Sequence, residues 1–525
     1  YEMRISDWSS DVCSSDLKMS KKLKIIIPII IVLLLIGGIA WGVYAFFANT
    51  PKNTYLKSEQ QTAKMYKDYF NDRFENEVKF QEKMKDNSFL SSLELSADAS
   101  DEIVKGLGIP KSVVNASKIK MSYGHDPKKE KSMINLEPTI ADSALGKFQL
   151  AADKDKHYFE SPLFKGKYSV NNSDLLSTYS KLTGEDEETA KENGITNQQL
   201  NLNTLFNNAQ AQQSDYSKIA EKYSELIVDK LDDDNFDKGK KEEIKVNGEK
   251  YKVRPVTLTL SRADTKKITL AVLEEAKKDK DLKKLMEEQG ATKDFEKDIK
   301  KAIDDVKETK KDEFAKIQSK IYTEKHTIVK REITITDKEN NKTKIKGTNT
   351  LEDDKLKLDY ALDFDQDKYT YAEAKYTIKG VSSKEKDNKY NDKYEFGKKT
   401  EYDESKIKLD NQEKVDGTKR QDKGKITVAL DKYSDENEFT FENNIDSDVK
   451  NNTQKSTLNI GIKYAEEPIN FILKSSTKLK ADIDFDDSGA KDFNSLSSKD
   501  REKLEKEIEK NGGKMFESIL KKASK

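Results

Sequence analysis

The chain has 525 residues, and its 96 Lys and Arg side chains nearly cancel its 97 Asp and Glu side chains, leaving a net charge of −1. Lys outnumbers Arg by more than ten to one. Both features argue against nucleic acid as a partner, because nucleic acid is bound by basic patches and preferentially by Arg. Charged residues make up 37% and hydrophobic residues 34% of the chain, which predicts a folded and strongly hydrated protein outside any membrane segment.

The first residues, 1–17, differ in composition from the rest of the chain. The string YEMRISDWSSDVCSSDL resembles a translated sequencing-adapter fragment, so we exclude it from the fold and expect the native chain to start at Met19. The only cysteine, Cys13, lies in this segment. The remaining chain is therefore expected to lack disulfides, a thiol nucleophile and a cysteine for lipid attachment.

An apolar segment, residues 25–48, contains no charged side chain. A helix of about 24 residues is long enough to cross the ~30 Å hydrocarbon core of a bilayer. Lys side chains in residues 18–24 precede it and favour a cytoplasmic N-terminus. The alternative is a cleaved signal peptide, which has a shorter apolar region. The sequence thus predicts a single-pass protein of the cell membrane whose bulk is extracellular.

Residues 51–88 carry apolar side chains near a 3.6-residue period and predict a long amphipathic helix, either packed on its own domain or dimerising as a stalk. Residues 89–318 predict strands followed by a helical insert. Within this part, Asn247–Gly248 is typical of a hairpin turn. Ser261 and Asp264 form a capping-box pattern that should begin a helix.

Residues 319–490 predict long antiparallel strands, because apolar and polar side chains alternate in stretches such as 356–364 and 458–464. In the last run the apolar side chains share one parity, with a bend or bulge expected around Ser475–Ser476. These side chains are the candidates for a ligand-binding face: Ile469, Phe471, Leu473, Leu479, Ile483 and Phe485. Residues 497–525 predict a C-terminal covering helix with a break at Gly512–Gly513.

An amphipathic sheet must cover its apolar face. The predicted fold class is therefore α+β: an N-terminal transmembrane helix, then one or more extracellular curved antiparallel β-sheets covered by helices on the concave side.

No catalytic motif is found, so we assign no catalytic residue, no cofactor and no metal centre. The three histidines, His125, His157 and His326, are scattered along the chain, and zinc-binding spacing is missing. One acidic turn reproduces part of a calcium loop, although Ser495 stands where the bidentate Glu is required. The candidate calcium ligands are Asp484, Asp486, Ser488 and Asp492. The alternative for this turn is a solvated connection between a strand and a helix.

The Lys-rich start followed by KKLKIIIPIIIVLLLIGGI, the long first helix and the segment KHYFESPLFKGKYSVNNSDL resemble a family of single-pass membrane-anchored proteins of Bacillus and related Gram-positive bacteria, classed by a domain of unknown function. The resemblance covers most of residues 19–525 and implies no mechanism. The strands with a covering helix are also similar to the half-barrel lipoprotein carriers of bacterial envelopes, which hold acyl chains in a concave apolar face. This chain differs from them in its helical insert near residues 173–318.

Two classes of function follow from these patterns. The first is a non-enzymatic envelope protein that cradles a lipid or another hydrophobic ligand in a concave sheet, or that contacts the cell wall or a protein partner. The alternative is an extracellular hydrolase that acts on cell-envelope material. The missing nucleophile motif and the scarcity of His favour the first class.

Overall fold

The computed structural model describes residues 49–100, 104, 108, 110–288, 295–365, 374–434, 436–464 and 467–523. The predicted segments 1–17, 18–24 and 25–48 therefore lie outside the described residues. The helices in the described part are α3 (Pro51–Arg73), α4 (Glu75–Lys85), α6 (Lys111–Asn115), α7 (Leu175–Thr183), α8 (Glu187–Glu192), α9 (Asn197–Leu200), α10 (Leu202–Asp229), α11 (Arg262–Lys278), α12 (Lys280–Glu288), α13 (Phe295–Glu308) and α14 (Ser498–Ala523).

The strands in the described part form one 22-stranded sheet. They are β1 (Phe89–Ala99), β2 (Lys118–Asp126), β3 (Lys131–Ile140), β4 (Ser143–Ala144), β5 (Phe148–Ala152), β6 (Lys156–Glu160), β7 (Tyr168–Asn171), β8 (Phe236–Lys238), β9 (Glu242–Val246), β10 (Glu249–Leu260), β11 (Lys316–Glu324), β12 (Thr327–Thr336), β13 (Lys342–Glu352), β14 (Lys355–Asp365), β15 (Ala374–Lys384), β16 (Lys389–Thr400), β17 (Glu404–Asp416), β18 (Lys419–Ala429), β19 (Asn437–Asp448), β20 (Thr453–Tyr464), β21 (Glu467–Leu479) and β22 (Lys491–Asp492).

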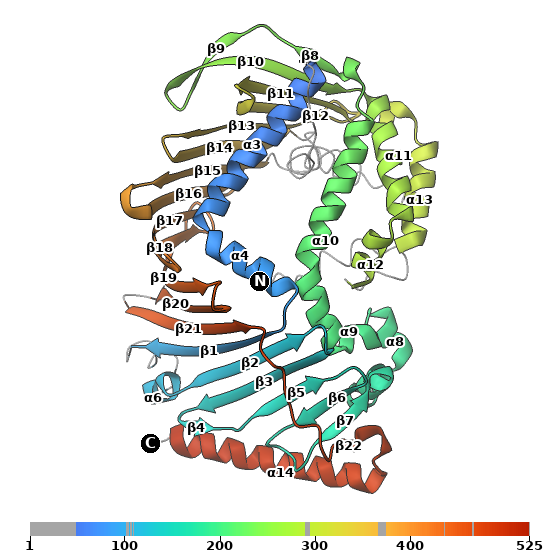
Figure 1. The fold of residues 1–525 in the computed structure, drawn as a ribbon, viewed down its shortest axis with the longest axis vertical. Helices are drawn as coiled ribbons and strands as arrows, with labels where there is room; N and C mark the ends of the chain where they lie inside the picture. The colour runs from blue at the N-terminus through green and yellow to red at the C-terminus, as the bar shows by residue number, and fades with distance from the viewer. Residues whose placement is uncertain are drawn as a thin grey trace.

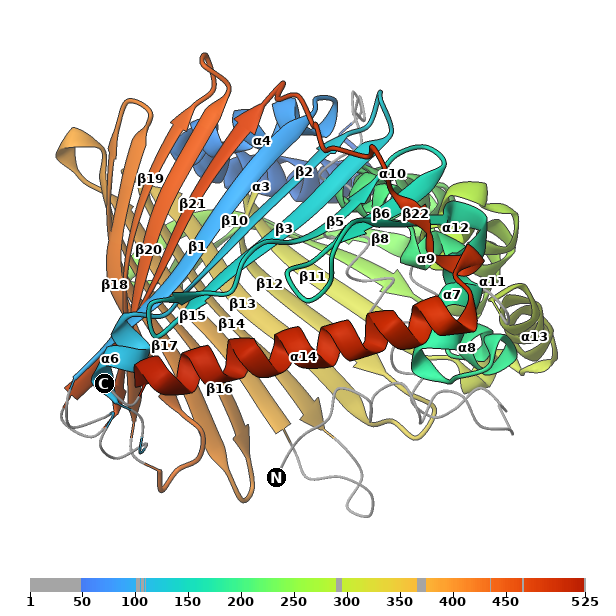
Figure 2. The same ribbon diagram turned by 90° about the horizontal axis from the view of Figure 1, so that it is seen from below.

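The sheet is a long antiparallel meander with its N-terminal strands added at the end. Strands β10 to β21 follow one another across it, and β21 then pairs with β1, which continues into β2, β3, β5, β6 and β7. Figure 1 shows that this sheet bends into an open arc, with α3 and α4 on its concave side and α10 standing opposite the strands. In Figure 2 the strands are seen side by side, with α14 crossing in front of them.

The bend is supported by glycines on the concave face. A Cβ atom at Gly347 would lie 2.1 Å from the ring of Tyr360, and one at Gly380 would lie 2.3 Å from the ring of Tyr394. Each glycine faces its tyrosine directly across the strand pair. The rings therefore lie over bare backbone, which lets neighbouring strands approach closely on this side of the sheet.

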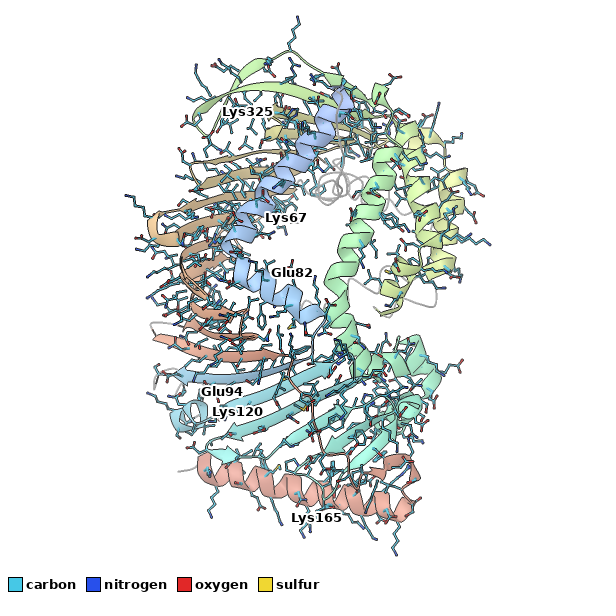
Figure 3. All side chains as sticks on the ribbon, in the orientation of Figure 1. Lys67, Glu82, Glu94, Lys120, Lys165 and Lys325 are labelled. Atoms are coloured by element: carbon cyan, nitrogen blue, oxygen red, sulfur yellow. The ribbon has the colours of Figure 1, made fainter. Side chains whose placement is uncertain are left out.

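The convex face of the sheet is charged because alternate residues of each strand point to opposite faces. Glu94 of β1 lies 3.7 Å from Lys120 of β2 and 3.8 Å from Lys474 of β21, and Figure 3 shows Glu94 and Lys120 among the many charged side chains around the molecule. Such cross-strand pairs of opposite charge suit a solvated surface. The concave face is consequently the one that has to be covered or filled.

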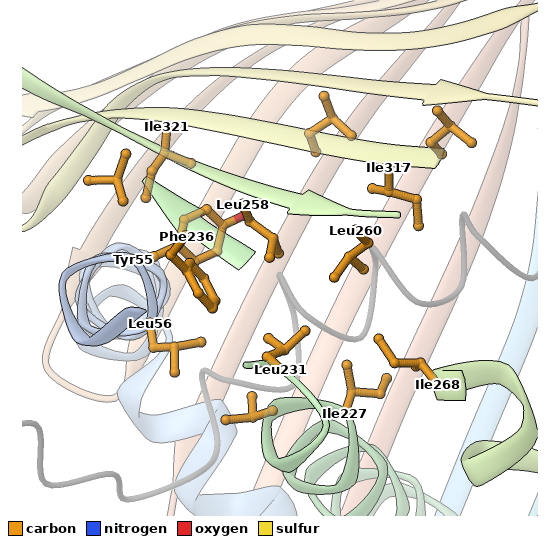
Figure 4. Packing of buried hydrophobic residues seen from close by; sticks show 14 of the residues in the cluster. Tyr55, Leu56, Ile227, Leu231, Phe236, Leu258, Leu260, Ile268, Ile317 and Ile321 are labelled. Carbon is orange, nitrogen blue, oxygen red and sulfur yellow. The ribbon is translucent and has the colours of Figure 1, made fainter. Parts of the chain in front are cut away.

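The main hydrophobic core lies at one end of the arc, where α3, α10 and α11 meet strands β10 to β12. Figure 4 shows Tyr55 and Leu56 of α3 packed with Ile227 of α10 and Ile268 of α11 over Leu258 of β10. The helix α11 begins at the predicted capping box, since Ser261 accepts a hydrogen bond from the backbone N–H of Asp264. The core thus fixes the helical insert to the first strands of the meander.

The first helix is broken near its middle. The sequence predicts one helix over residues 51–88, and the structure has α3 and α4 joined at Phe74, whose backbone leaves the helical region with φ −108° and ψ 27°. Thr50 caps the start of α3 by accepting from the backbone N–H of Asn53. The kink lets the two helices follow the curve of the sheet from β12 to β19.

Two histidines hold the N-terminal end of α10. The ring nitrogen Nε2 of His157 accepts the backbone N–H of Leu202 at 2.9 Å, and Nδ1 donates to Asn172 at 2.7 Å. His125 is fully buried between Ser132 and Asn207, at 2.7 and 2.8 Å. Burial lowers the pKa of both histidines below the usual value.

The predicted fold class is corrected by these findings. The described strands belong to one continuous sheet, and the helices α3 and α4 lie over the polar side chains of its concave face. No helix in the described part is long and apolar enough to cross a membrane, because the longest ones, α3, α10 and α14, carry charged side chains along their length. The predicted single-pass topology and cell-membrane localisation are corrected accordingly, and the predicted anchor, residues 25–48, lies outside the described residues.

The C-terminal helix also differs from its prediction. Ser497 accepts from the backbone N–H of Asp500 at the start of α14, as the sequence predicts. The helix then runs through Gly512–Gly513 without the predicted break. It lies beside α6 and β4.

Candidate ligand-binding face

The concave face of the sheet carries a continuous strip of apolar side chains that we call the apolar band. Registers place its members opposite one another from β15 to β21 and on through β1 to β3. It consists of Tyr376, Ile378, Phe396, Ile407, Leu409, Ile426, Val428, Phe439, Phe441, Leu458, Ile460, Ile462, Ile469, Phe471, Leu473, Leu93, Leu95, Ile119, Met121 and Leu136.

The other ends of the same strands, on the same face, are polar. We call this part the polar half; its residues include Ser382, Asp392, Glu413, Asp422, Ser447, Ser456, Ser475, Thr477 and Ser91. Ser456 and Ser475 share a hydrogen bond of 2.7 Å, and Ser91 and Thr477 share one of 2.8 Å. Each strand therefore changes from polar to apolar along its length, always in the same direction across the sheet.

Helices α3 and α4 lie over the polar half. Arg73 at the end of α3 is buried, and its guanidinium donates to both carboxylate oxygens of Asp392 at 2.9 and 2.6 Å and of Glu413 at 2.9 and 2.8 Å. It also donates to Ser382 at 3.2 Å and lies 4.6 Å from the centre of the Tyr390 ring. We call Arg73, Asp392 and Glu413 the Arg73 cluster. Its bidentate geometry fixes the helix on the sheet.

The two carboxyl groups of the Arg73 cluster have pKa values shifted in opposite directions. Burial would raise the pKa of Asp392, but the hydrogen bonds and charge of Arg73 outweigh it and hold that pKa below its usual range. Burial raises the pKa of Glu413 in spite of Arg73, and the neighbouring Asp422 raises it further. One guanidinium thus serves two carboxylates, and Glu413 is the one more readily protonated.

A second buried ion pair holds the start of α3. Arg331 of β12 donates to the two carboxylate oxygens of Glu59 at 2.6 and 2.5 Å, and all of these groups are buried. Nearby, the Tyr55 hydroxyl donates to Ser319 at 2.7 Å, and burial raises the pKa of that hydroxyl. The α3–α4 segment makes apolar contacts at its two ends, through Tyr55 and Leu56 at the start and Phe80 near the end. Between these ends it contacts the sheet through polar and charged groups.

The apolar band is left open by these helices. Six of its side chains remain between 38% and 46% exposed, namely Leu95, Ile119, Leu136, Tyr376, Phe396 and Ile407. A continuous strip of partly exposed apolar side chains is a candidate surface for contact with another molecule. Among the described strands, charged residues at the alternating positions of the band stand at its outer edge, where Lys398 pairs with Ser405 and Glu467 pairs with Tyr464.

The predicted ligand-face residues are divided between three places. Ile469, Phe471 and Leu473 lie on β21 within the apolar band. Leu479 ends the strand and is buried with Phe80 of α4 and Phe89 of β1. Ile483 and Phe485 contact Met133 and Ala151 on the opposite face. The chain leaves the sheet at Lys480, where φ is +56°, so the predicted single run of one parity to Phe485 is wrong.

The register of β21 is also more regular than predicted. Its pairing with β1 and with β20 runs through Ser475 and Ser476 without a shift. The predicted bend at this point is therefore wrong, and the strand is shorter because it ends at Leu479.

Three of the four candidate calcium ligands, Asp486, Ser488 and Asp492, are engaged in other interactions. Asp486 forms an ion pair with Lys167 and accepts the backbone N–H of Ser488 at 3.0 Å. These hydrogen bonds, from Lys167 first, lower the pKa of Asp486. Asp492 accepts the backbone N–H of Asn494 at 2.9 Å, and Asp484 is exposed. Among the described residues, no three His, Cys, Asp or Glu side chains are grouped to hold a metal ion.

Sequence reasoning missed most of the apolar band and the Arg73 cluster. The alternation Ile426-x-Val428-x-Leu430, and the pair Phe439 and Phe441, carry the same period-two signal that identified the neighbouring strands. The partners of Arg73 had no local signal, since they lie 319 and 340 residues away in sequence.

Comparisons with known proteins give no family. No family model matches the chain, and no curated protein matches it. Among solved structures, a loop L8 deletion mutant of OmpT, an outer membrane protein of Vibrio cholerae, shares 7% identity over 75% of this chain and 97% of its own, with a TM-score of 0.22. Acinetobacter baumannii OccAB4 shares 6% identity over 75% of this chain and 98% of its own, with a TM-score of 0.24. Likeness at this level supports no conclusion about the present chain.

Proposed function

We propose that this chain is a binding protein for a hydrophobic molecule, and that the apolar band holds the hydrocarbon part of its ligand. The observation that carries the proposal is the mismatch between helices and sheet. Helices α3 and α4 cover the polar half, while six side chains of the apolar band on the same strands stay 38% to 46% exposed. A sheet that had to bury only its own apolar residues would place its helices over the band.

The chemistry of the band favours a lipid over a protein surface. Protein interfaces combine an apolar centre with about one hydrogen bond per 100–200 Å². The side chains named for the band are aliphatic or aromatic. Their few polar atoms are the hydroxyl oxygen of Tyr376 and the sulfur of Met121. The band also lies on the inside of a curved sheet (Figure 1), where thin, flexible hydrocarbon chains fit better than a flat surface. The role supported is binding, with no bond made or broken.

The test is to purify the full chain and record native mass spectra before and after extraction with organic solvent. A bound mass that extraction removes is expected. Titration with a fluorescent fatty acid should then show saturable binding, weakened about tenfold or more by the double variant Ile407→Glu and Ile119→Glu, because a charge is placed against hydrocarbon.

The matched control is Leu182→Glu, since Leu182 of α7 is 68% exposed and lies outside the band. It should bind as the parent protein does. Equal loss in both variants, or no binding by the parent protein, would contradict the proposal. Circular dichroism of each variant verifies that the sheet is retained.

A further inference from the structure

Three of the most exposed large apolar side chains in the described part lie at the tips of two neighbouring hairpins. Tyr402 is 76% exposed in the turn between β16 and β17, and Leu430 and Tyr433 are 66% and 81% exposed between β18 and β19. Strands β17 and β18 are paired, with Lys406 opposite Ala429 at this end. The two tips are therefore adjacent, and we call Tyr402, Leu430 and Tyr433 the rim.

The rim continues the apolar band. Leu430 follows Ile426 and Val428 at alternate positions, so it extends the concave side of β18. Phe396 and Ile407, which are 45% and 46% exposed, lie opposite each other on β16 and β17. Ile407 in turn lies opposite Val428, two residues before Leu430. A hydrocarbon chain can thus pass from the rim to the band over apolar side chains throughout.

Some acidic side chains near the rim are paired, whereas Glu401 and Asp403, which flank Tyr402, form no ion pair among the described residues. Glu404 pairs with Lys406 at 2.7 Å, and Glu436 pairs with Lys408 at 2.9 Å. Asp431 accepts the backbone N–H groups of Tyr433 and Ser434 at 2.7 Å each.

The basic side chains are placed differently. Lys432 lies 4.9 Å from the centre of the Tyr433 ring, and Lys398 stands at the concave edge of β16, opposite Ser405. The rim therefore combines amphipathic rings and a leucine with charged side chains of both signs.

We infer that the rim docks on the surface of a phospholipid bilayer, from which the apolar band takes its ligand; this inference rests on the proposed function. Tyrosine rings favour the membrane–water interface, because one edge is apolar and the hydroxyl stays hydrated. Leu430 enters the acyl region, and Lys398 meets headgroup phosphates. Separate hairpin tips penetrate a fluid surface readily but offer little area to a folded protein.

The experiment places an environment-sensitive nitrobenzoxadiazole label at single cysteines of the full chain, in a Cys13→Ser background. The labelled variants are Tyr402→Cys and Tyr433→Cys, with Leu182→Cys as a control of similar exposure outside the rim. On addition of phosphatidylcholine vesicles, labels at the two rim positions should shift to the blue and brighten, while the label at the control position stays unchanged. A local label reports rim contact whatever else in the chain touches the vesicle.

A second variant tests the contribution of the rim itself. Leu430→Ser and Tyr433→Ser together should raise by about tenfold the lipid concentration needed for half of the change at position 402, since two apolar groups no longer enter the bilayer. Unchanged fluorescence at 402 and 433, or an equal change at 182, would overturn the inference.

The proposed function is tested separately by fatty-acid binding without vesicles. Fatty-acid binding with no response of the rim labels would overturn the docking inference and leave the proposed function standing. A rim response without fatty-acid binding would support docking and contradict the proposed function.

Discussion

At the scale of single residues, Arg73 is the charged side chain near the proposed ligand face that joins helix α3 to two strands of the sheet. It is buried and satisfies two carboxylates on two strands, Asp392 of β16 and Glu413 of β17. Removing one member of a buried ion pair leaves the others unpaired in a poorly solvated site, which typically costs about 3–5 kcal/mol.

Arg73→Ala should therefore lower the free energy of unfolding by about 3–5 kcal/mol in urea denaturation followed by circular dichroism. The matched control is Lys64→Ala on the same helix, whose partner Asp68 is exposed and whose loss should cost less than about 1 kcal/mol. Similar losses for both variants would show that the cluster does not hold the helix.

The sequence predicts such residues only where their partners are near in the chain. The alternation in residues 356–364 correctly indicates which side chains share a face, because the period of a strand is local. The ion pairs of Arg73 and Glu59 could not be predicted, since their partners stand hundreds of residues away and the chain is rich in both charges. Gly347 likewise gives no sign that it lies under Tyr360 until the register is known.

At the scale of elements, the attachment of α10 should depend on pH. His157 must be neutral at Nε2 to accept the backbone N–H of Leu202, and burial keeps the pKa of His157 and of His125 below that of an unfolded histidine, about 6.5. As the pH falls through this value, the unfolded chain binds protons before the folded one does. The stabilisation present above about pH 7 is therefore lost toward about pH 5.

Hydrogen exchange at the backbone of residues 202–207, corrected for intrinsic rates, should accelerate between about pH 7 and about pH 5 relative to residues 458–462 of β20. His157→Gln should remove much of this dependence, because an amide oxygen accepts the same hydrogen bond at either pH. Exchange at α10 with the same pH dependence in both proteins would contradict the assignment.

Elements defined by local signals are the ones that the sequence predicts well. The hairpin at Asn247–Gly248 is confirmed as the turn between β9 and β10, where both residues have positive φ, and the capping box of Ser261 is confirmed at the start of α11. The end of β21 at Leu479 and the kink at Phe74 were not predicted. Each depends on what the chain packs against, and so does the choice of the polar half as the surface that α3 and α4 cover.

At the scale of the whole molecule, the apolar band is larger than one lipid. It crosses the sheet from β15 to β3, which at about 4.8 Å between strands is roughly 43 Å along the curve. One leaflet of a bilayer is about 15 Å of hydrocarbon, half of the ~30 Å core. A single acyl chain laid along the band would cover about one third of the band and leave the other two thirds in contact with water.

We therefore expect two or more hydrocarbon chains to bind each protein at saturation, counted by native mass spectrometry during titration with a fatty acid. Phe396→Glu on β16 and Ile119→Glu on β2, near opposite ends of the band, should each remove part of the bound ligand. Saturation at a single fatty acid, abolished by either change, would indicate one confined site instead.

The position of β1 has a consequence for the synthesis of the chain. One side of β1 pairs with β2, the next strand along the chain, while its other side pairs with β21, so that Ser91 meets Thr477, 386 residues later. At translation rates of about 5–20 residues per second, that side stays unpaired for on the order of 20–80 s. During this time β1 is an open edge of the kind that recruits other strands. Whatever shields this edge in the nascent chain helps to decide how much of the protein folds without aggregation.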